Sequence, residues 1–369
     1  MTAFVLAAVL ILHGVIHAAG FAKAYRLAEL PQLASPIARP AGVIWLLAAV
    51  GFVATAALLV AGARVWAVVG IVAVFVSQAL IASDFRDARL GTIVNAALLV
   101  IIALALADLR PSSLRSRYRN DARSLGAAAA AVAPSPVTEA DLGRLPPLVQ
   151  TYLRRAGVVG RPHVHRLRAV FKGRFRRSPD APWMPMSAEQ RNFLQPGPAR
   201  LFFMKAAQWG VPFVAYHRYA GSEATMQVRV AGVLEVVDAS GPVMTQSETV
   251  TLLNDMCVLA PAMLVDAPVT WKTIGDHQVE ASYANAGHTV SAILTFDANG
   301  DLAGFVSGDR YQSDGKTERR LPWSTPLADY RDFGPARLAA RGEARWREGE
   351  PAVEWTYGDF VLQRIAYNE

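Results

Sequence analysis

Four stretches of the chain contain no charged residue, and they constrain the fold more than any other feature. They cover residues 2–22, 41–63, 65–83 and 90–107. A helix rises about 1.5 Å per residue, so each stretch is long enough to cross a hydrocarbon core of about 30 Å. A helix also pairs its own backbone polar groups, which lipid cannot do. The sequence therefore predicts four transmembrane helices, with a cleaved signal peptide as the less favoured interpretation of residues 2–22.

Charged residues divide the chain into two parts. Residues 1–109 contain ten Asp, Glu, Lys and Arg residues, and the remaining 260 residues contain 57, a density that is normal for a soluble domain. This distribution excludes a wholly soluble enzyme and a disordered chain, and the single cysteine excludes a disulfide scaffold. We predict a four-transmembrane-helix domain over 1–109, a basic and Ala/Pro-rich linker over 110–137, and a β-rich soluble domain over 138–369.

The orientation of the chain in the membrane stays open at this point. An even number of spans places both ends on one side, and the positive-inside rule then has to assign that side. The loops on the two sides carry five and six basic residues, so the counts do not decide. The sequence predicts a multi-pass membrane protein without fixing the side of its soluble domain.

Several polar side chains interrupt the predicted spans, where burial in lipid is costly. His13 and His17 are four residues apart in the first span and therefore share a helix face. As the chain passes back and forth, the end of the first span, the end of the third and the start of the fourth lie at the same membrane face. We expect a cluster there of His17, Lys23, Asp84, Asp87 and Asn95, with His13 and Gln78 lying deeper.

Three interpretations of this polar cluster remain open. The favoured one is structural, with hydrogen bonds that hold the helices together at about 0.6 kcal/mol each. The second is a metal site with His13 and His17 as ligands and Asp84 or Asp87 as a third. The third is a site for a polar small molecule or a proton. No cofactor other than such a metal ion is indicated.

From residue 138 the pattern is that of a soluble α+β domain. Thr138 is a candidate helix cap, and Pro146 and Pro147 divide the helical pattern that follows. From about residue 164, apolar and polar residues alternate over about ten short strands, with a hairpin turn at Asn299-Gly300. Thr245 and Glu248 have the spacing of a capping box at the start of one apolar helix. We predict a large antiparallel sheet, such as a half-barrel, with one covering helix, a shape that often holds an apolar cavity.

No motif in the soluble domain specifies a reaction. Cys257 lies on the apolar stripe of the helix, so we predict a buried, inert thiol. Glu248 and Asp255 are seven residues apart and share a helix face, but the sequence identifies no partners for a two-carboxylate mechanism. His163 and His165 stand among arginines, a poor setting for a cation. The basic residues between positions 154 and 177 favour a solvated strand face or contact with anionic lipid over nucleic acid.

The chain resembles a bacterial domain family of unknown function, whose members carry a β-rich domain, sometimes behind a four-helix membrane unit. The strings that carry the resemblance are His13-Gly-Val-Ile-His17, Gly20-Phe-Ala-Lys-Ala-Tyr25, Ser77-Gln-Ala-Leu-Ile81, Asp87-Ala-Arg-Leu-Gly-Thr-Ile-Val-Asn95, Trp183-Met-Pro185, Ala188-x-Gln190, Pro322-Trp-Ser-Thr-Pro326, Trp355-Thr-Tyr-Gly-Asp-Phe360 and Tyr367-Asn368. The family supplies no reaction, so the resemblance implies no catalytic residue. The domain is also similar to the half-barrels of bacterial lipoprotein carriers, which implies an apolar concavity outside the cytoplasm.

The leading hypothesis is a multi-pass protein of the bacterial inner membrane whose tethered domain binds an apolar or lipid-like ligand without catalysis. Membrane lipid is the expected partner, and nucleic acid is not expected. One alternative is a membrane-embedded enzyme or metal site built on His13, His17, Asp84 and Asp87. Another is a structural or assembly protein that takes no small ligand.

Overall fold

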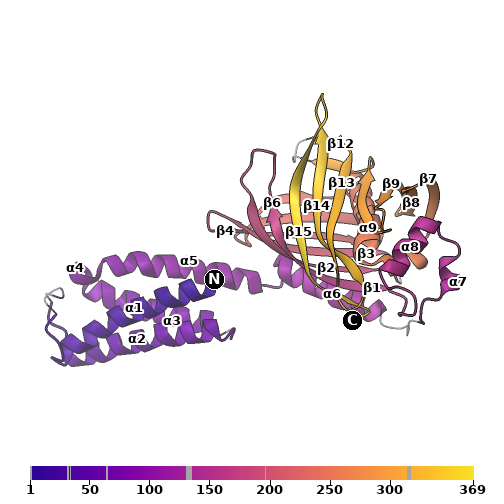
Figure 1. Cartoon of the computed structure of the whole chain (residues 1–369). Helices are drawn as coiled ribbons and strands as arrows, with labels where there is room; N and C mark the ends of the chain where they lie inside the picture. The colour runs from indigo at the N-terminus through magenta and orange to yellow at the C-terminus, as the bar shows by residue number, and fades with distance from the viewer. Residues whose placement is uncertain are drawn as a thin grey trace. The chain divides into compact units, whose positions relative to one another are not determined.

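All four uncharged stretches form long helices in the computed structural model of the chain, drawn in Figure 1. The structure describes residues 2–30, 33, 35–63, 65–129, 135–195, 197–313 and 317–369. The chain divides into two units, Met1–Arg110 and Pro111–Glu369. Each unit has a hydrophobic core of its own.

The first unit is helical. Its long helices are α1 (Thr2–Ala24), α2 (Arg39–Val60), α3 (Trp66–Ser83) and α5 (Leu90–Leu109), and the short α4 (Phe85–Ala88) connects the last two. Within the described residues, four helices are long and apolar enough to cross a membrane. The predicted helices are confirmed, and their length and composition are those of a membrane protein.

Small residues let the helices of this unit approach closely. A Cβ atom on Gly20 would lie 2.4 Å from the ring of Trp45, and one on Gly42 would lie 2.4 Å from the Cβ of Ala24. These positions bring α1 and α2 together, and α3 packs against both α2 and α5. Close packing of this kind holds helices together in lipid, where no hydrophobic effect drives them against each other.

Three helices precede the sheet in the second unit. They are α6 (Leu114–Ala129), α7 (Glu139–Leu142) and α8 (Pro147–Arg155). Thr138 and Asp141 cap α7 reciprocally, and the chain between α7 and α8 turns at Pro146, so both predictions for this segment are confirmed. The structure also places a helix inside the predicted linker, because Leu114, Tyr118 and Ala122 recur every four residues and are buried against β2–β4. The boundaries predicted for that linker stay a prediction.

An antiparallel sheet of thirteen strands forms the body of the second unit within the described residues. The strands are β1 (Arg166–Phe175), β2 (Met184–Phe193), β3 (Ala199–Gln208), β4 (Val211–Ala220), β5 (Glu223–Val230), β6 (Leu234–Ala239), β7 (Val269–Gly275), β8 (Gln278–Asn285), β9 (His288–Phe296), β10 (Leu302–Ser307), β13 (Trp323–Asp332), β14 (Arg337–Glu348) and β15 (Val353–Tyr367). Their order is β6-β5-β4-β3-β2-β1-β15-β14-β13-β10-β9-β8-β7, and β11 (Tyr311–Ser313) and β12 (Glu318–Arg320) form a separate hairpin. The sheet is open at β6 and β7 and does not close into a barrel, which confirms the predicted fold class. The hairpin predicted at Asn299-Gly300 joins β9 and β10.

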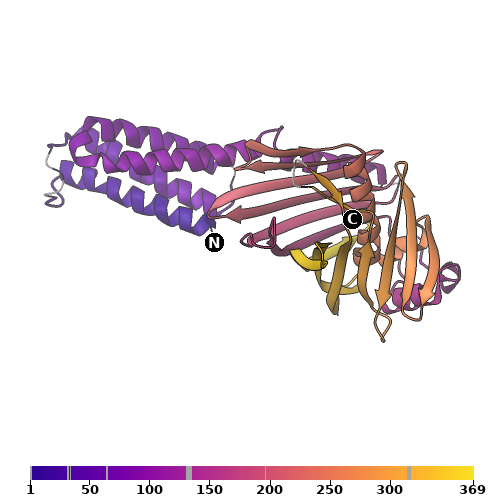
Figure 2. The same cartoon turned by 90° about the horizontal axis from the view of Figure 1, so that it is seen from above.

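One long helix lies inside the curve of the sheet. Strands β2–β6 run crosswise to β13–β15 in Figure 1, and Figure 2 shows the same sheet from above. Helix α9 (Pro242–Leu259) contacts β5 from one half of the sheet and β8, β9, β10 and β14 from the other. The 3₁₀ helix η1 (Pro261–Val265) follows it, and both are buried in the main core. The sheet therefore bends around α9, whose side chains fill its interior.

The capping box predicted at Thr245 and Glu248 is wrong. Helix α9 begins three residues earlier, at Pro242, after Gly241. The Thr245 hydroxyl donates to the carbonyl of Gly241 and accepts from the amide of Ala224 at the start of β5. Thr245 therefore joins the helix to the sheet, and Glu248 lies more than one and a half turns inside the helix.

Candidate functional site

The polar side chains of the helical unit form one buried network. His13 Nε2 lies 3.0 Å from Asn95 Oδ1, and the Asn95 amide donates to Ser77 Oγ at 2.9 Å and to Gln78 Oε1 at 3.1 Å. His17 Nε2 lies 2.7 Å from Ser77 Oγ. The network continues from Gln78 Nε2 to Thr92 Oγ1 at 3.2 Å. It connects α1, α3 and α5 through side chains that carry no fixed charge.

Four of the predicted site residues meet in this network, namely His13, His17, Gln78 and Asn95. Asp87 lies in α4, where its carboxylate accepts from the amide of Ser35 at 2.9 Å. Asp84 ends α3, and Lys23 lies in the last turn of α1. Among the described hydrogen bonds, none joins Lys23, Asp84 or Asp87 to the network.

The hydrogen bonds of His17 bear on the metal interpretation. A carbonyl only accepts, so His17 Nδ1 donates to the His13 carbonyl at 2.9 Å. Its other ring nitrogen bonds Ser77, which leaves neither nitrogen open to a cation. Within the described residues, no group of three or more His, Cys, Asp or Glu side chains is placed to hold a metal ion. The metal site predicted on His13, His17, Asp84 and Asp87 stays a prediction, and the geometry favours the structural interpretation.

The second unit contains a buried network of full charges. The Arg200 side chain from β3 is 7 % exposed and donates to two carboxylates of α9, Glu248 at 2.8 Å and Asp255 at 2.7 Å. The amides of Gln190 and Asn192 on β2 also donate to Asp255, at 2.7 and 2.9 Å. The single guanidinium of Arg200 thus binds two carboxylates, two turns apart on α9, to the sheet.

Electrostatics within this network favour its charged form. Burial alone would raise the pKa of the Glu248 carboxyl, but Arg200, His217 and Arg310 outweigh it and hold the pKa well below its ordinary value. For Arg200, burial opposes the charge, whereas Asp255 and Glu248 raise its pKa. Burying an ion pair costs desolvation energy, so an arrangement of this kind is more valuable for fixing one packing geometry than for net stability.

Sequence reasoning placed Glu248 and Asp255 on one helix face and missed their partner. A signal for Arg200 was present, because it alternates with Phe202 and Met204 and so lies on their face of β3. An arginine at an inward strand position needs a buried counter-charge. Two carboxylates seven residues apart on an otherwise uncharged helix supply this counter-charge.

An aromatic ladder crosses three strands beside this network. Trp323, Trp346 and Trp355 are direct cross-strand partners on β13, β14 and β15. The Tyr357 hydroxyl accepts from Trp323 Nε1 and from Arg310, both at 2.9 Å. Arg310 lies 4.4 Å from the ring centroid of Trp323 and 3.9 Å from Glu248. Two of the strings that carry the family resemblance therefore lie on the strands that flank β14 and are joined by the Trp323–Tyr357 hydrogen bond. Arg310 connects them to the charged network.

The remaining candidates have structural surroundings. Cys257 is fully buried, and burial raises the pKa of its thiol, which agrees with the predicted inert role. The Nδ1 atom of His163 lies 2.7 Å from Asp266 Oδ2. Several basic residues between 154 and 177 form ion pairs, with Arg155 bound to Asp301 and Arg168 to Glu189.

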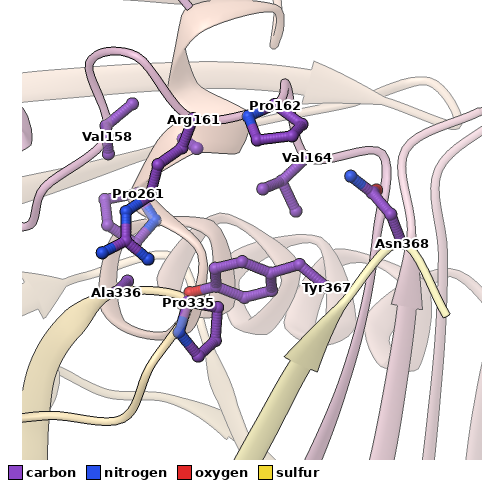
Figure 3. A pocket seen from close by; sticks show the side chains of 10 residues that line it. Val158, Arg161, Pro162, Val164, Pro261, Pro335, Ala336, Tyr367 and Asn368 are labelled. Carbon is purple, nitrogen blue, oxygen red and sulfur yellow. The ribbon is translucent and has the colours of Figure 1, made fainter. Parts of the chain in front are cut away.

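A pocket of about 340 Å³ opens where several loops of the second unit meet (Figure 3). Its wall is mainly apolar and comprises Val158, Arg161, Pro162, Val164, Pro261, Ala262, Pro335, Ala336, Tyr367 and Asn368. Figure 3 shows the Tyr367 ring between Val164 and Pro335, with the Arg161 guanidinium nearby. The Tyr367 hydroxyl donates to the carbonyl of Leu259, which holds the ring in place. The size lies at the lower end of the range for ligand pockets.

Residues 135–360 match the model of a family described as "Family of unknown function (DUF6544)". The chain belongs to this family. The match confirms the resemblance predicted from the sequence and covers most of the β-rich unit of this DUF6544 member. No curated protein matches the chain.

Two solved structures are remotely similar to this DUF6544 chain. One is a DUF1329 family protein from Desulfovibrio piger, with 9 % identity and a TM-score of 0.34, covering 60 % of this chain and 91 % of that one. The other is a putative outer membrane lipoprotein-sorting protein domain from Vibrio parahaemolyticus, with 10 % identity and a TM-score of 0.30, covering 55 % of this chain and 85 % of that one. The description of the family names no reaction.

Proposed function

We propose that the β-rich domain binds an apolar, lipid-like ligand and holds it without chemical conversion. The observation that carries this proposal is the apolar pocket of Figure 3, in which seven of the ten lining residues are Val, Pro or Ala. Apolar walls with a few placed polar groups are typical of small-molecule sites. Because α9 fills the interior of the sheet, the pocket lies at the ends of the elements.

The polar groups of the pocket suit an amphipathic ligand with an anionic head. Arg161 donates to the Gly334 carbonyl, and a guanidinium keeps further donors for a carboxylate or phosphate. The Asn368 side chain is already bound to the backbone of His163 and His165. Arg161 is therefore the residue that we expect to bind the head group, while Val158, Val164 and Ala336 contact the chain.

The setting of the domain supplies such ligands. The four apolar helices indicate that the domain is tethered to a bilayer, which we propose to be the bacterial inner membrane. A domain tethered to a bilayer meets lipid at high local concentration, because tethering raises the effective concentration of both partners.

The test uses the full chain in lipid nanodiscs and two photoreactive probes, a diazirine fatty acid and the matching fatty alcohol. We expect labelled peptides from residues 158–164 and 335–336. Arg161→Gln should reduce labelling by the acid more than by the alcohol, since only the acid has a charged head. Ala336→Phe should reduce labelling by both, because its ring fills the pocket.

Arg177→Gln is the matched control, since Arg177 is an exposed arginine that does not line the pocket. The proposal fails if the labelled peptides of the β-rich domain lie away from residues 158–164 and 335–336, or if Ala336→Phe labels as strongly as the parent chain while its circular dichroism is unchanged.

A further inference from the structure

Two neighbouring hairpins at one end of the sheet carry exposed apolar side chains at their tips. The β3–β4 hairpin exposes 87 % of Trp209 and 43 % of Val211. The β5–β6 hairpin exposes Val233, Leu234 and Val236, of which Leu234 is 62 % exposed. The amide of Ala231 donates to the carbonyl of Pro212, so the two tips lie against each other. Together these five side chains form one apolar patch, which we call the tip patch.

The tip patch includes the edge of the sheet. Strand β6 is the last strand on its side and has no further strand beside it among the described elements. An exposed apolar edge invites association, and soluble proteins normally protect such an edge with charges, proline or a covering element. The patch therefore indicates a surface that a partner covers.

The path of the chain shows which partner is near. Arg229, three residues before the β5–β6 turn residue Gly232, donates to the carbonyl of Ser112 at 2.9 Å. Helix α6 then leads away from the tips, since Arg117 donates to Gln227, Asp121 binds Tyr216, and Gly126 binds Arg166 at the opposite end of the sheet. The chain thus enters the second unit at the end of the sheet that carries the tip patch.

The membrane helix α5 ends at Leu109, three residues before Ser112. Three residues of extended chain span at most about 11 Å, and the polar layer on each side of a bilayer is about 5–8 Å thick. The tips of β3–β6 are therefore within reach of the head-group layer of the membrane from which α5 emerges.

The residue types at the tips fit that layer. Tryptophan is enriched at membrane–water interfaces, because its ring is apolar and its indole N–H is polar. The neighbouring acidic residue, Glu235, is neutralised by Arg229 at 3.2 Å. The exposed Arg110, two residues before Ser112, adds attraction to anionic lipid.

The backbone conformation at Trp209 also supports an external contact. Trp209 and Gly210 form the two-residue loop of the β3–β4 hairpin, with φ angles of 50° and 82°. Such a turn prefers Asn-Gly, and a bulky residue at positive φ is strained. An almost fully exposed tryptophan in a strained turn contributes nothing to the core, so its presence is explained by an external contact.

We infer that the tip patch inserts into the lipid head-group layer and holds the β-rich domain against the bilayer by a second contact besides α5. The opposite end of the same hairpins gives the contrast, since the β4–β5 turn consists of Gly221 and Ser222 followed by Glu223. Insertion therefore fixes one end of the sheet at the membrane and keeps the other in water.

The test uses the full chain in nanodiscs with lipids that carry nitroxide quenchers at the upper acyl chain. Val211→Cys and, as the matched control, Ser222→Cys are labelled with an environment-sensitive fluorophore, while Cys257 stays buried and unlabelled. We expect blue-shifted emission and strong quenching at position 211, and neither at position 222. Equal quenching at both positions, or none at position 211, overturns the inference.

Substitution of the tryptophan separates membrane contact from folding. In the Val211→Cys background, Trp209→Asn should raise the Tm of the domain by relieving the strained turn, yet reduce the quenching at position 211. A blue shift at position 211 without quenching by the nitroxide lipids would show that another protein surface covers the tip patch. This result would also overturn the inference.

Discussion

The two units bury polar groups in opposite ways. In the helical unit, His13, Ser77 and Asn95 share hydrogen bonds without a fixed charge. In the β-rich unit, Arg200 holds two full carboxylates in a core of similar depth. A charge at the centre of a bilayer costs several kcal/mol even when it is partly relieved, whereas a domain folded in water can bury a charge if its partners are complete. The difference teaches that the solvent around each unit decides which polar groups its core tolerates.

The largest effect should follow from breaking the charged network. Arg200→Met leaves Glu248 and Asp255 buried without their counter-charge, and we expect the free energy of unfolding of the β-rich unit to fall by about 3–5 kcal/mol. Guanidinium unfolding of the full chain in detergent, followed by near-ultraviolet circular dichroism, measures it. Arg154→Met is the control, because its pair with Glu139 is solvent-exposed and should contribute far less to stability. Equal losses in the two variants would contradict a special role for Arg200.

Loss of the central residue of the neutral network should destabilise the helical unit less. Asn95→Leu removes hydrogen bonds to His13, Ser77 and Gln78, and at about 0.6 kcal/mol for each bond we expect the helical unit to lose about 2 kcal/mol. Loss of helicity in mixed micelles of increasing dodecyl sulfate content measures this change. Val100→Leu, on an exposed face of α5, should leave the unfolding unchanged. A loss as large as that of Arg200→Met would remove the contrast between the units.

Low pH should weaken a third polar cluster, in which Asp301 forms ion pairs with Arg155 and Arg337. Burial raises the pKa of Asp301, but the two arginines lower it further, to about 2 from an ordinary 3.8. A lowered folded-state pKa gives stability that is complete above pH 3.8 and is lost as the pH falls towards 2.

Asp301→Asn should therefore cost about 1 kcal/mol at neutral pH, since both arginines stay partly solvated. The difference from the parent chain should vanish between pH 4 and pH 2, as measured by thermal unfolding across that range. The exposed Asp180→Asn serves as the control. A difference that does not change with pH would show that the carboxylate acts by packing alone.

The smallest effect should come from the edge of the neutral network. Thr92→Val removes the single bond to Gln78 and keeps the side-chain volume, so we expect a loss of about 0.6 kcal/mol in the micelle assay. A loss equal to that of Asn95→Leu would indicate that the network acts as one cooperative unit.

Local signals in the sequence predicted much of this fold. Unbroken apolar runs predicted the four helices, and alternation predicted the strands around Val228 and Leu294. About ten strands were expected, and the structure describes more, because β14 (Arg337–Glu348) is rich in arginine and does not read as an apolar alternation. Two of its arginines pair with carboxylates on the neighbouring strand β15, Arg341 with Asp359 and Arg345 with Glu354.

The sites were less predictable, because their partners are distant in the sequence. Glu248 and Thr245 match a local capping signal, but the real partner of Glu248 is Arg200, 48 residues earlier. Asn95 was expected at the membrane face with His17, and His13 and Gln78 deeper. In the structure Asn95 bonds His13 and Gln78 directly, and no described hydrogen bond joins the carboxylates of the connecting loop to this network. Which of several polar groups at one membrane face meet depends on helix rotation, which periodicity alone does not fix.

The pairing of β1 with β15 has a consequence for how the protein is made. These strands are neighbours in the middle of the sheet, yet about 180 residues separate the end of β1 from the start of β15. Translation adds about 5–20 residues per second, so roughly 10 to 40 s pass between the synthesis of β1 and that of its partner β15. The helices of the first unit leave the ribosome well before that, so the chain is membrane-inserted while its sheet is still two unjoined halves. The two halves of the sheet are then joined late, only after β15 has been translated.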